Sequence, residues 1–311
     1  MAGMSTEQAA QRVALVAGAT RGAGRAIAVE LARAGLDVYA TGRSSRARGA
    51  SEIGRPETIE ETGELLAAAG GQGTALVVDH EDPAAVADLV TRIGSGHGRL
   101  DVLVNDIFGG DRYAQWHTPM WEHDLAGGLR MLRMGVDTHL ITAHAALPLR
   151  LRSDRGLLVE MTDGTAEVNA RYRERVGFFY DLVKANVSRI ILGLTHELRG
   201  TAVTALGVTP GWLRSENMLD NFGVTEERWR DALDKTPGFA ISESPVYVAR
   251  GVAALAQDPE VARFAGQVLS ARQLADRYGV TDADGSRPDA WGYIAAYGME
   301  EQSGRDVERF R

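Results

Sequence analysis

The sequence predicts a doubly wound α/β domain, in which a mainly parallel sheet of seven strands carries helices on both faces. Short apolar runs alternate with helical patterns about seven times along the chain, and continuous apolar runs are typical of parallel strands buried on both faces. A glycine-rich turn, "GATRGAG", joins the first expected strand to the first expected helix. The 311 residues show no internal repeat and no clear linker, so we expect one domain.

The strands are expected where Val-rich or Leu-rich runs end in glycine or polar residues. They cover residues 12–18, 37–42, 74–79, 100–106, 156–162, 201–210 and 266–271. Within the single domain, residues 1–311, we expect a core of about 12–270, a loop-rich lid of about 213–244 and a C-terminal extension of about 271–311. The tail after Pro288 is polar and is expected to be partly disordered.

The helices are expected between these strands. They cover residues 23–35, 55–71, 82–94, 121–147, 179–198 and 245–256. Asp82 is suited to the N-cap of its helix because Pro83 follows at the first turn, and Gly35 is suited to the left-handed position that ends the first helix. Three glycines weaken the long region 121–147.

Composition excludes several classes of function. The chain has no cysteine, which excludes disulfides and thiolate chemistry, and its net charge of −8 argues against nucleic acid as a partner. The seven histidines show no spaced ligand set, so no metal site is expected. No signal pattern and no run of 18 apolar residues is present, so we expect a cytoplasmic protein that does not enter a membrane.

The glycine turn has the pattern of a phosphate-binding loop. Gly18, Gly22 and Gly24 allow a tight turn and a close approach of the backbone to a pyrophosphate at a helix N-terminus. No acid follows the second strand, where an acid often binds the ribose hydroxyls. Arg21 and Arg43 are instead placed to hold a 2′-phosphate, although either alone is more often a solvated surface charge.

A second group of polar residues lies later in the chain. Tyr180 and Lys184 are four residues apart in an expected helix and therefore share one face. That spacing is common by chance. The stretch "LLVEMTDGTA" precedes them, and its apolar run stops at Thr162, Asp163 and Thr165, at the expected carboxyl end of a strand.

The order "GATRGAG", "LVND", "YDLVK" and "TPG" resembles the short-chain dehydrogenase/reductase family, from about Arg12 to Ser270. Within that family, "THELRG", the stretch "DPEVARFAGQVLSARQLADRYGVTDADG" and the arginine pair resemble the branch that contains the dehydrogenase/reductase member-one proteins. The resemblance implies a one-domain Rossmann fold, NADP(H) as cofactor and hydride exchange with a carbonyl or an alcohol. It also implies a homodimer or a homotetramer.

The resemblance also implies residue roles. Tyr180 would donate its phenolic proton to the carbonyl oxygen, and the Lys184 ammonium would lower the pKa of that phenol and hold the nicotinamide ribose. Asp79 would meet the adenine, Asn105 would line the cofactor channel and Ser215 would lie beside the carboxamide. The full expected cofactor-binding set is Gly18, Thr20, Arg21, Gly22, Gly24, Arg43, Asp79, His80, Asn105, Tyr180, Lys184, Pro210 and Ser215.

The chain departs from the family pattern at several places. The family's "NNAG" is replaced by "NDIFGG", with Asp106 and Phe108, and the asparagine usual in the long helix aligns with Gly135. The serine expected at the end of the fifth strand aligns with Asp163. The interval from there to Tyr180 is about four residues longer than usual, with "EVNARYRER" as the inserted segment.

Asp163 admits four interpretations. A buried, protonated carboxyl of raised pKa would donate as an acid, or Asp163 would turn away and let Thr165 supply the hydroxyl. Alternatively the protein reduces carbonyls poorly and the carboxylate attracts a cationic substrate, or Asp163 merely caps the turn at Gly164. We favour Thr165, because an extended chain returns a residue to the same face after two positions. The catalytic candidates are therefore Tyr180, Lys184, Asp163 and Thr165.

The leading functional expectation is an NADPH-dependent carbonyl reductase acting on a small hydrophobic substrate. Aromatic residues suggest a hydrophobic pocket, although aromatic residues near a lid more often only pack: they are Phe108, Trp212, Phe222, Trp229 and Phe239. The lid of about 213–244 is expected to be a mobile cover. The alternatives are an NADP(H)-binding protein with little catalysis, in a regulatory or sensor role, and a dehydratase or epimerase on the same scaffold.

Overall fold

The computed structural model describes residues 11–50, 52–299 and 301–311. Its centre is one parallel sheet of seven strands in the order β3-β2-β1-β4-β5-β6-β7. The strands are β1 (Val13–Ala17), β2 (Asp37–Gly42), β3 (Gly73–Val77), β4 (Val102–Asn105), β5 (Gly156–Met161), β6 (Val203–Thr209) and β7 (Val268–Ser270). All seven expected strands and the doubly wound sheet are confirmed.

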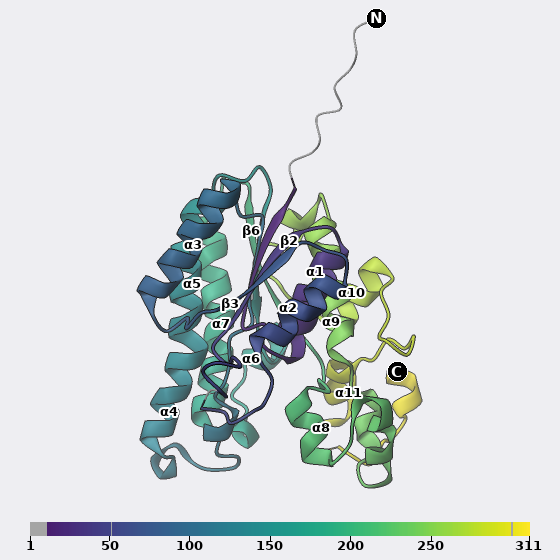
Figure 1. Ribbon diagram of the computed structural model, residues 1–311. Coiled ribbons are helices and arrows are strands. Elements are labelled where there is room, and N and C mark those ends of the chain that lie inside the picture. The colour runs from purple at the N-terminus through teal and green to yellow at the C-terminus, as the bar shows by residue number, and fades with distance from the viewer. Residues whose placement is uncertain (1–10, 51, 300) are drawn as a thin grey trace, which may run out of the picture.

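Helices cover both faces of the sheet, as Figure 1 shows. They are α1 (Gly22–Arg33), α2 (Ile59–Ala68), α3 (Pro83–His97), α4 (Leu125–Leu132), α5 (Thr138–Arg150), α6 (Ala166–Asn169), α7 (Phe178–Glu197), α8 (Glu216–Phe222), α9 (Pro245–Gln257), α10 (Ala271–Tyr278) and α11 (Ala290–Tyr297). One apolar core joins the sheet to α1, α2, α9 and α10, and a second joins it to α3, α5 and α7. Within the described part of the chain, no helix is long and apolar enough to cross a membrane.

Local sequence signals account for several helix ends. The Asp82 side chain accepts hydrogen bonds from the backbone of Ala84 and Ala85 at the start of α3, as its N-cap pattern predicts. The same helix runs past the expected end at 94, because the residue that ends it is Gly98, with φ of 70°.

The long helical region between β4 and β5 is interrupted. A π-helical turn, Arg133–Asp137, separates α4 from α5. Gly135 lies in this turn, where a Cβ atom would come within 2.5 Å of the Val183 side chain on α7. Glycine is therefore required for the close approach of α7, the helix that carries Tyr180 and Lys184.

The lid is built differently from the expectation. Residues 213–244 hold α8 and two 3-10 segments, Glu226–Asp234 and Pro237–Ile241, with Trp229 and Phe239 buried among them. The rings of Trp212, Phe222, Trp229 and Phe239 contact one another. These four residues therefore pack against one another in and beside the lid, which agrees with the expectation of packing and not with that of a pocket lining.

The C-terminal extension is folded onto the lid. The expected disorder after Pro288 is wrong for the described residues, because apolar side chains of α11 and of the 3-10 segment Val307–Phe310 pack together. This apolar cluster contains Ile241, Ala290, Tyr293 and Phe310. Two backbone hydrogen bonds add to it: Gly238 N–H donates to Gln302, and Asp289 N–H donates to Phe310.

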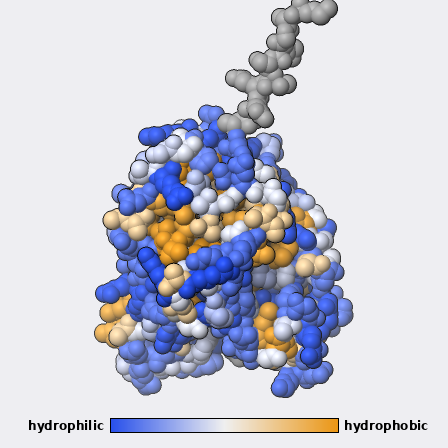
Figure 2. Space-filling model, in the orientation of Figure 1, coloured by the Kyte–Doolittle hydropathy of each residue, from blue (hydrophilic) through white to orange (hydrophobic). Residues whose placement is uncertain are grey.

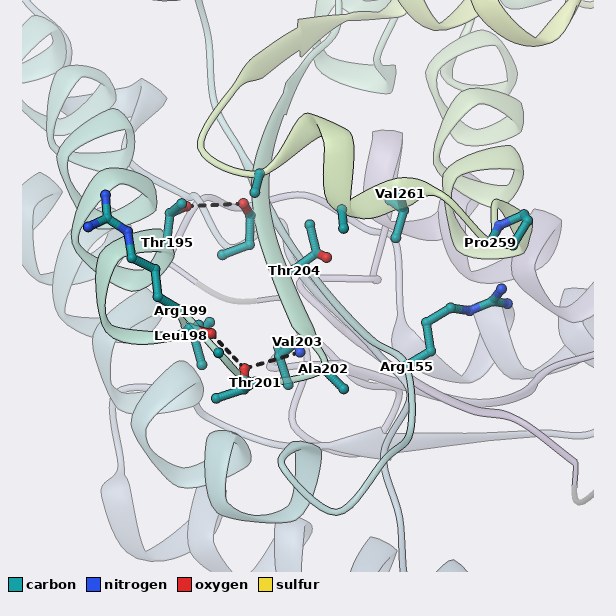
Figure 3. A pocket seen from close by; sticks show the side chains of 14 residues that line it. Arg155, Thr195, Leu198, Arg199, Thr201, Ala202, Val203, Thr204, Pro259 and Val261 are labelled. Atoms are coloured by element: carbon teal, nitrogen blue, oxygen red, sulfur yellow. Dashed lines mark hydrogen bonds between the residues drawn. The ribbon is translucent and has the colours of Figure 1, made fainter.

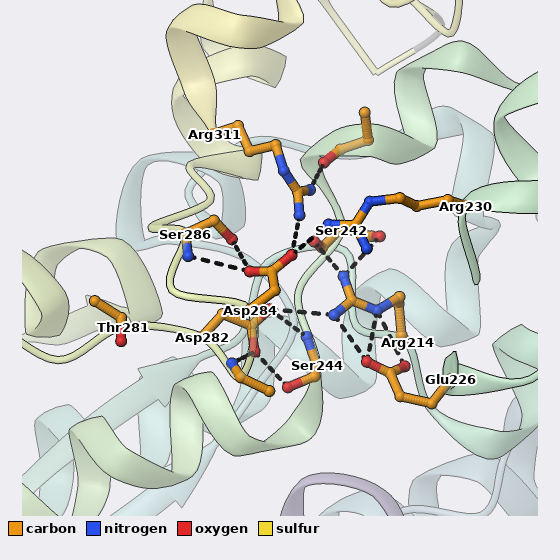
Figure 4. Close-up of polar contacts among 12 residues, drawn as sticks. Arg214, Glu226, Arg230, Ser242, Ser244, Thr281, Asp282, Asp284, Ser286 and Arg311 are labelled. Carbon is orange, nitrogen blue, oxygen red and sulfur yellow. Dashed lines mark hydrogen bonds and ion pairs between the residues drawn. The ribbon is translucent and has the colours of Figure 1, made fainter. Parts of the chain in front are cut away.

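A buried polar network also joins the lid to the extension (Figure 4). The Arg214 guanidinium is 2 % exposed and donates to Glu226, to the carbonyl of Ser242 and, at 3.2 Å, to Asp282. The guanidinium carbon of Arg214 also lies 4.3 Å from the ring centre of Trp229. Each charge has a partner, so the lid and the extension form one packed unit.

Candidate active site

Two side chains of α7 face the carboxyl end of β5. The Lys184 Nζ atom lies 5.4 Å from the ring centre of Tyr180 and 3.6 Å from the ring centre of Phe108. Thr162, the first residue after β5, donates a hydrogen bond of 3.0 Å to the carbonyl of Lys184. The strand end thus fixes the helix turn that presents the tyrosine and the lysine.

Asp163, and not Thr165, contacts the tyrosine. The Tyr180 hydroxyl donates to Asp163 Oδ2 at 3.1 Å. Thr165 is the N-cap of α6, where its hydroxyl accepts from the backbone of Val168 at 3.4 Å. The expectation that Asp163 turns away is therefore wrong, because the turn at Gly164, with φ of 117°, starts a helix instead of continuing the extended chain.

Arg173, from the inserted segment, completes this group. Its Nη1 atom donates to Asp163 Oδ2 at 3.3 Å and to the Asp163 carbonyl at 3.2 Å, while its Nε atom donates to Asp181 Oδ1 at 2.9 Å. The residue is 6 % exposed. The insertion thus delivers a buried cation to the carboxylate that stands at the expected serine position.

Burial has the largest effect on the pKa values of Tyr180 and Lys184. It raises the pKa of Tyr180 well above the ordinary phenol value, and the negative charges of Asp163 and Asp111 add to this. Burial lowers the pKa of Lys184, although the same two carboxylates oppose it. The expected lowering of the phenol pKa by Lys184 does not prevail in this structure, because desolvation and the carboxylates outweigh it.

The glycine loop is closely packed. A Cβ atom on Gly18 would lie 2.3 Å from the carbonyl oxygen of Asp106, and one on Gly24 would lie 2.4 Å from the carbonyl oxygen of Gly18. The buried Asp106 carboxyl accepts a hydrogen bond from the Gly24 backbone, and burial raises the pKa of Asp106 to about 6. Asp106 therefore supports the loop from the position where the family has its second asparagine.

The loop already binds an anion from its own chain. The Gly22 N–H, at the start of α1, donates to both carboxylate oxygens of Glu216, at 3.2 and 3.0 Å. Arg25 lies 3.9 Å from the same carboxylate. The loop is thus shaped and oriented for a negatively charged group, so its residues fit the pyrophosphate of a dinucleotide.

The two arginines expected at the 2′-phosphate differ in their surroundings. Arg43 donates to Glu81 at 2.8 Å and to Glu52 at 3.3 Å, and Arg130 binds the same two glutamates. Within the described residues, the Arg21 guanidinium makes no hydrogen bond or ion pair, and burial lowers the pKa of Arg21. Arg21 is therefore the freer of the two cations.

Two expected cofactor residues use their side chains inside the protein. The His80 ring is 3 % exposed and lies between the hydroxyls of Thr41 and Thr142, at 2.8 and 2.7 Å. Burial lowers the pKa of His80 to about 3, so the imidazole is neutral at physiological pH. Asn105 donates to Glu160 at 2.8 Å, in a buried group that also includes His139.

The remaining expected residues have structural contacts at the same edge of the sheet. Asp79 accepts from the backbone of Glu81 at 3.0 Å, and Thr20 is buried. The Pro210 carbonyl accepts from Trp291 at 2.8 Å, and Ser215 is the N-cap of α8.

Sequence reasoning missed Arg173 and Glu216. Both contact residues too far away along the sequence for a short motif to include the pair. The only available signal was the extra length of the segment that contains Arg173. Among the described residues, no cluster of His, Asp and Glu side chains is arranged to hold a metal ion.

Two hollows of the surface lie away from this site. One of about 350 Å³ is lined by residues around the beginning of β6, including Arg155, Val203 and Pro259 (Figure 3). Another lies between α3 and α5. Neither contains Tyr180 or Lys184, so the candidate site rests on its side chains and not on cavity shape.

Comparison with known proteins agrees with this geometry. A family model described as short chain dehydrogenase matches residues 12–223. Dehydrogenase/reductase SDR family member 1 of Mus musculus is 30% identical over 297 residues, covering 94% of this chain and 89% of its own.

Solved structures share the fold. A putative dehydrogenase from Xanthomonas campestris matches with a TM-score of 0.70 and 24% identity over 90% of this chain and 94% of its own. A single-substitution variant of actinorhodin polyketide ketoreductase, described with NADPH, matches with a TM-score of 0.65 and 24% identity over 84% of this chain and 95% of its own. The family model and the mouse relative, each spanning most of this chain, show that the chain belongs to the short-chain dehydrogenase/reductase family of oxidoreductases.

Proposed function

We propose that the protein is an NADP(H)-dependent oxidoreductase that exchanges hydride with the carbonyl or alcohol group of a small, hydrophobic molecule. The observation that carries the proposal is the position of the Tyr180 hydroxyl, beside Lys184 and at the carboxyl end of β5. Ligands of open α/β sheets bind at this edge. The glycine loop, with its anion-binding N–H, lies at the same edge.

The residues of the chain perform the proton part of the reaction. The nicotinamide, when bound, supplies or accepts the hydride. Tyr180 donates its proton to the oxygen of the carbonyl, and its raised pKa keeps it protonated at neutral pH until that oxygen gains negative charge. The nearby Lys184 stabilises the phenolate that remains, because an opposite charge favours the ionised form.

Aromatic side chains beside the tyrosine support a hydrophobic substrate. The Phe108 and Trp116 rings lie 5.7 and 5.8 Å from the Tyr180 ring, centre to centre. Trp116 is 53% exposed, so it presents apolar surface next to the reacting hydroxyl.

NADPH oxidation with a panel of hydrophobic ketones and aldehydes tests the proposal. The parent should consume NADPH and form the alcohol, and Tyr180→Phe should lose about 100-fold or more in kcat while binding NADPH as before. Leu65→Ala is the control, since this exposed residue of α2 lies outside the site. Absence of turnover with every carbonyl would overturn the proposal.

A second candidate function is an NADP(H)-binding protein with little catalysis. It is favoured by one observation: the hydroxyl that would protonate a substrate already donates to a carboxylate, Asp163. Tight NADPH binding without turnover of the ketone panel is the result expected for this candidate.

We also infer a homodimer or homotetramer, as the family resemblance implies, and a cytoplasmic location. Large leucines lie exposed on α5 and α7, which pack on one face of the sheet, and on α4, which contacts α7. Leu129 on α4, Leu140 on α5 and Leu192 on α7 are 45%, 49% and 55% exposed. Figure 2 shows hydrophobic surface at the lower left, where α4 lies. Light scattering in solution distinguishes this assembly from a monomer.

A further inference from the structure

The contacts of Asp163 connect a buried phenol to solvent. The side chain of Asp163 is 35% exposed, whereas Tyr180, whose hydroxyl it binds, is partly buried by Phe108 and Trp116. A carboxylate that touches both the phenol and water can accept a proton from one and return it to the other.

The nearby hydroxyls are engaged elsewhere. Thr162 donates to the Lys184 carbonyl, and Thr165 caps α6. Gly135, where the family has its asparagine, offers no side chain, and the close approach of Val183 leaves no room for one. Among these positions, Asp163 alone contacts the phenol with a group that can carry a proton.

Arg173 fixes this carboxylate in place. It binds both the Oδ2 atom and the carbonyl of Asp163, and its own guanidinium is anchored by Asp181, the residue after Tyr180. Because Arg173 is almost fully buried, its charge depends on these two carboxylate partners, Asp163 and Asp181. The orientation of Asp163 towards Tyr180 is thus set by the inserted segment.

We propose that Asp163 is the proton relay between Tyr180 and solvent, and that Arg173 is the residue that positions it. The inference rests on the proposed carbonyl reduction and adds the step that resets the enzyme after each turnover. It assigns a role to the insertion, which exists in this chain where the family's serine is absent.

The steps balance in atoms and charge. In reduction, the Tyr180 O–H bond breaks and its proton forms the new O–H bond of the alcohol, which leaves a phenolate. The Asp163 carboxylate then takes up a proton from solvent water. It gives that proton to the phenolate oxygen of Tyr180 and becomes a carboxylate again. In alcohol oxidation, each proton moves in the opposite direction. No redox change occurs in the relay itself.

Charged groups from several elements surround the relay. Tyr180 and Lys184 approach from α7, Arg173 from the insertion, and Asp111 from the 3-10 segment Asp111–Tyr113. Asp106 acts on Lys184 from the end of β4. Two cations therefore face Asp163, Arg173 from the insertion and Lys184 from α7.

Comparison of the first turnover with steady-state turnover tests the relay. The first reduction uses the proton already on Tyr180, so Asp163→Asn should keep the rate of the first turnover within about threefold and lower steady-state kcat about 10- to 100-fold. In Asp163→Ala, added formate or acetate should restore steady-state turnover in proportion to its concentration. An unchanged kcat, an equal loss in the first turnover, or the absence of rescue would each overturn the relay.

Substitutions of Arg173 test the positioning role. Arg173→Gln should lower kcat, gain from added formate and shift the pH profile of kcat, whereas Arg173→Lys, which keeps the cation, should retain most of the parent rate. Arg171→Gln removes an exposed cation of the same insertion and should behave as the parent. If Arg173→Gln binds NADPH and turns over with the parent's pH profile, Arg173 has no positioning role. Failure of the parent to reduce any carbonyl would instead reject the proposed function.

Discussion

At the scale of single residues, Arg21 is the position on which cofactor choice is expected to depend. Arg43 shares two glutamates with Arg130, so a 2′-phosphate must compete with Glu52 and Glu81 for that guanidinium. Among the described residues no carboxylate forms a hydrogen bond or an ion pair with the Arg21 guanidinium, although the charges of Glu57 and Glu216 act on it from nearby. A bidentate cation of this kind is well suited to a phosphate.

Arg21→Gln should therefore weaken NADPH binding about 10- to 100-fold and leave NADH binding nearly unchanged. Calorimetric dissociation constants for both cofactors check this. Arg33→Gln, at the far end of α1, is the control because its side chain is 56% exposed. Equal affinities of the parent for NADPH and NADH would contradict the assignment of a phosphate-binding role.

Another residue, Glu243, makes stability depend on pH. It is 1% exposed, accepts a hydrogen bond from the Gly211 backbone and has one oxygen without a partner among the described residues. Burial raises the pKa of Glu243 to about 8 from the ordinary value of 4.5, and the nearby Asp282 adds to the shift. The folded protein therefore holds this proton over a range in which the unfolded chain releases it.

The sign of the effect follows from proton counting. Between pH 4.5 and about 8 the folded state binds more protons than the unfolded state, so the free energy of unfolding falls as pH rises. Glu243→Gln should flatten the decline of Tm over this range, with Glu122→Gln, an exposed carboxyl, as the control. A decline equally steep in Glu243→Gln would show that Glu243 does not titrate there.

At the scale of elements, α8 connects the lid to the edge of the sheet at which the cofactor is expected to bind. Glu216, its first residue, holds the Gly22 N–H, and Asp220, one turn later, pairs with Arg55 at 2.7 Å. The lid helix therefore contacts both the glycine loop and the segment after β2. A pyrophosphate that binds the Gly22 N–H must first displace the Glu216 carboxylate.

Glu216→Gln should tighten NADPH binding about tenfold, because it removes a negative charge from a site that must receive phosphate. Glu227→Gln, a surface carboxyl of the same lid that contacts only its own turn, is the matched control. Weaker binding by the Glu216 variant would show that the carboxylate supports the bound cofactor instead of competing with it.

Elements were predictable where one local signal determines them. Asp82 fixes the start of α3 through its own cap, as expected, whereas the helix ends at Gly98, past the expected end at 94. The π-helical turn at Gly135 was not predictable, because glycine is required there by the close approach of Val183, a residue of another helix. The same division holds in the site: Tyr180 and Lys184 share a face by local spacing, whereas Arg173 reaches Asp163 only through the path of the insertion.

At the scale of the whole molecule, the alternation of strands and helices determined the sheet but not the union of lid and extension. That union depends on pairs far apart in sequence, such as Arg214 with Asp282 and Gly238 with Gln302. The last residue takes part as well, because Arg311 donates to the carbonyl of Ala240 and pairs with Asp284 (Figure 4). Such contacts leave no periodic pattern in the sequence.

The lid should therefore lose order when the extension loses its apolar anchor. Phe310 is 8% exposed, and its ring contacts those of Tyr293 and Tyr297. Phe310→Ala removes about 3–5 kcal/mol of packing, and this loss should fall on the lid–extension unit because the sheet has separate cores.

Hydrogen exchange shows which part of the molecule loses stability in Phe310→Ala. In Phe310→Ala, amides of residues 236–244 and 289–299 should exchange faster, those of β1, β4 and β5 should keep the parent rates, and bound NADPH should no longer slow exchange in α8. Leu65→Ala, which trims an exposed leucine of α2, should leave all these rates unchanged. Faster exchange spread evenly over the sheet would mean that the extension stabilises the whole domain, and unchanged exchange in the lid would mean that the polar network alone holds it closed.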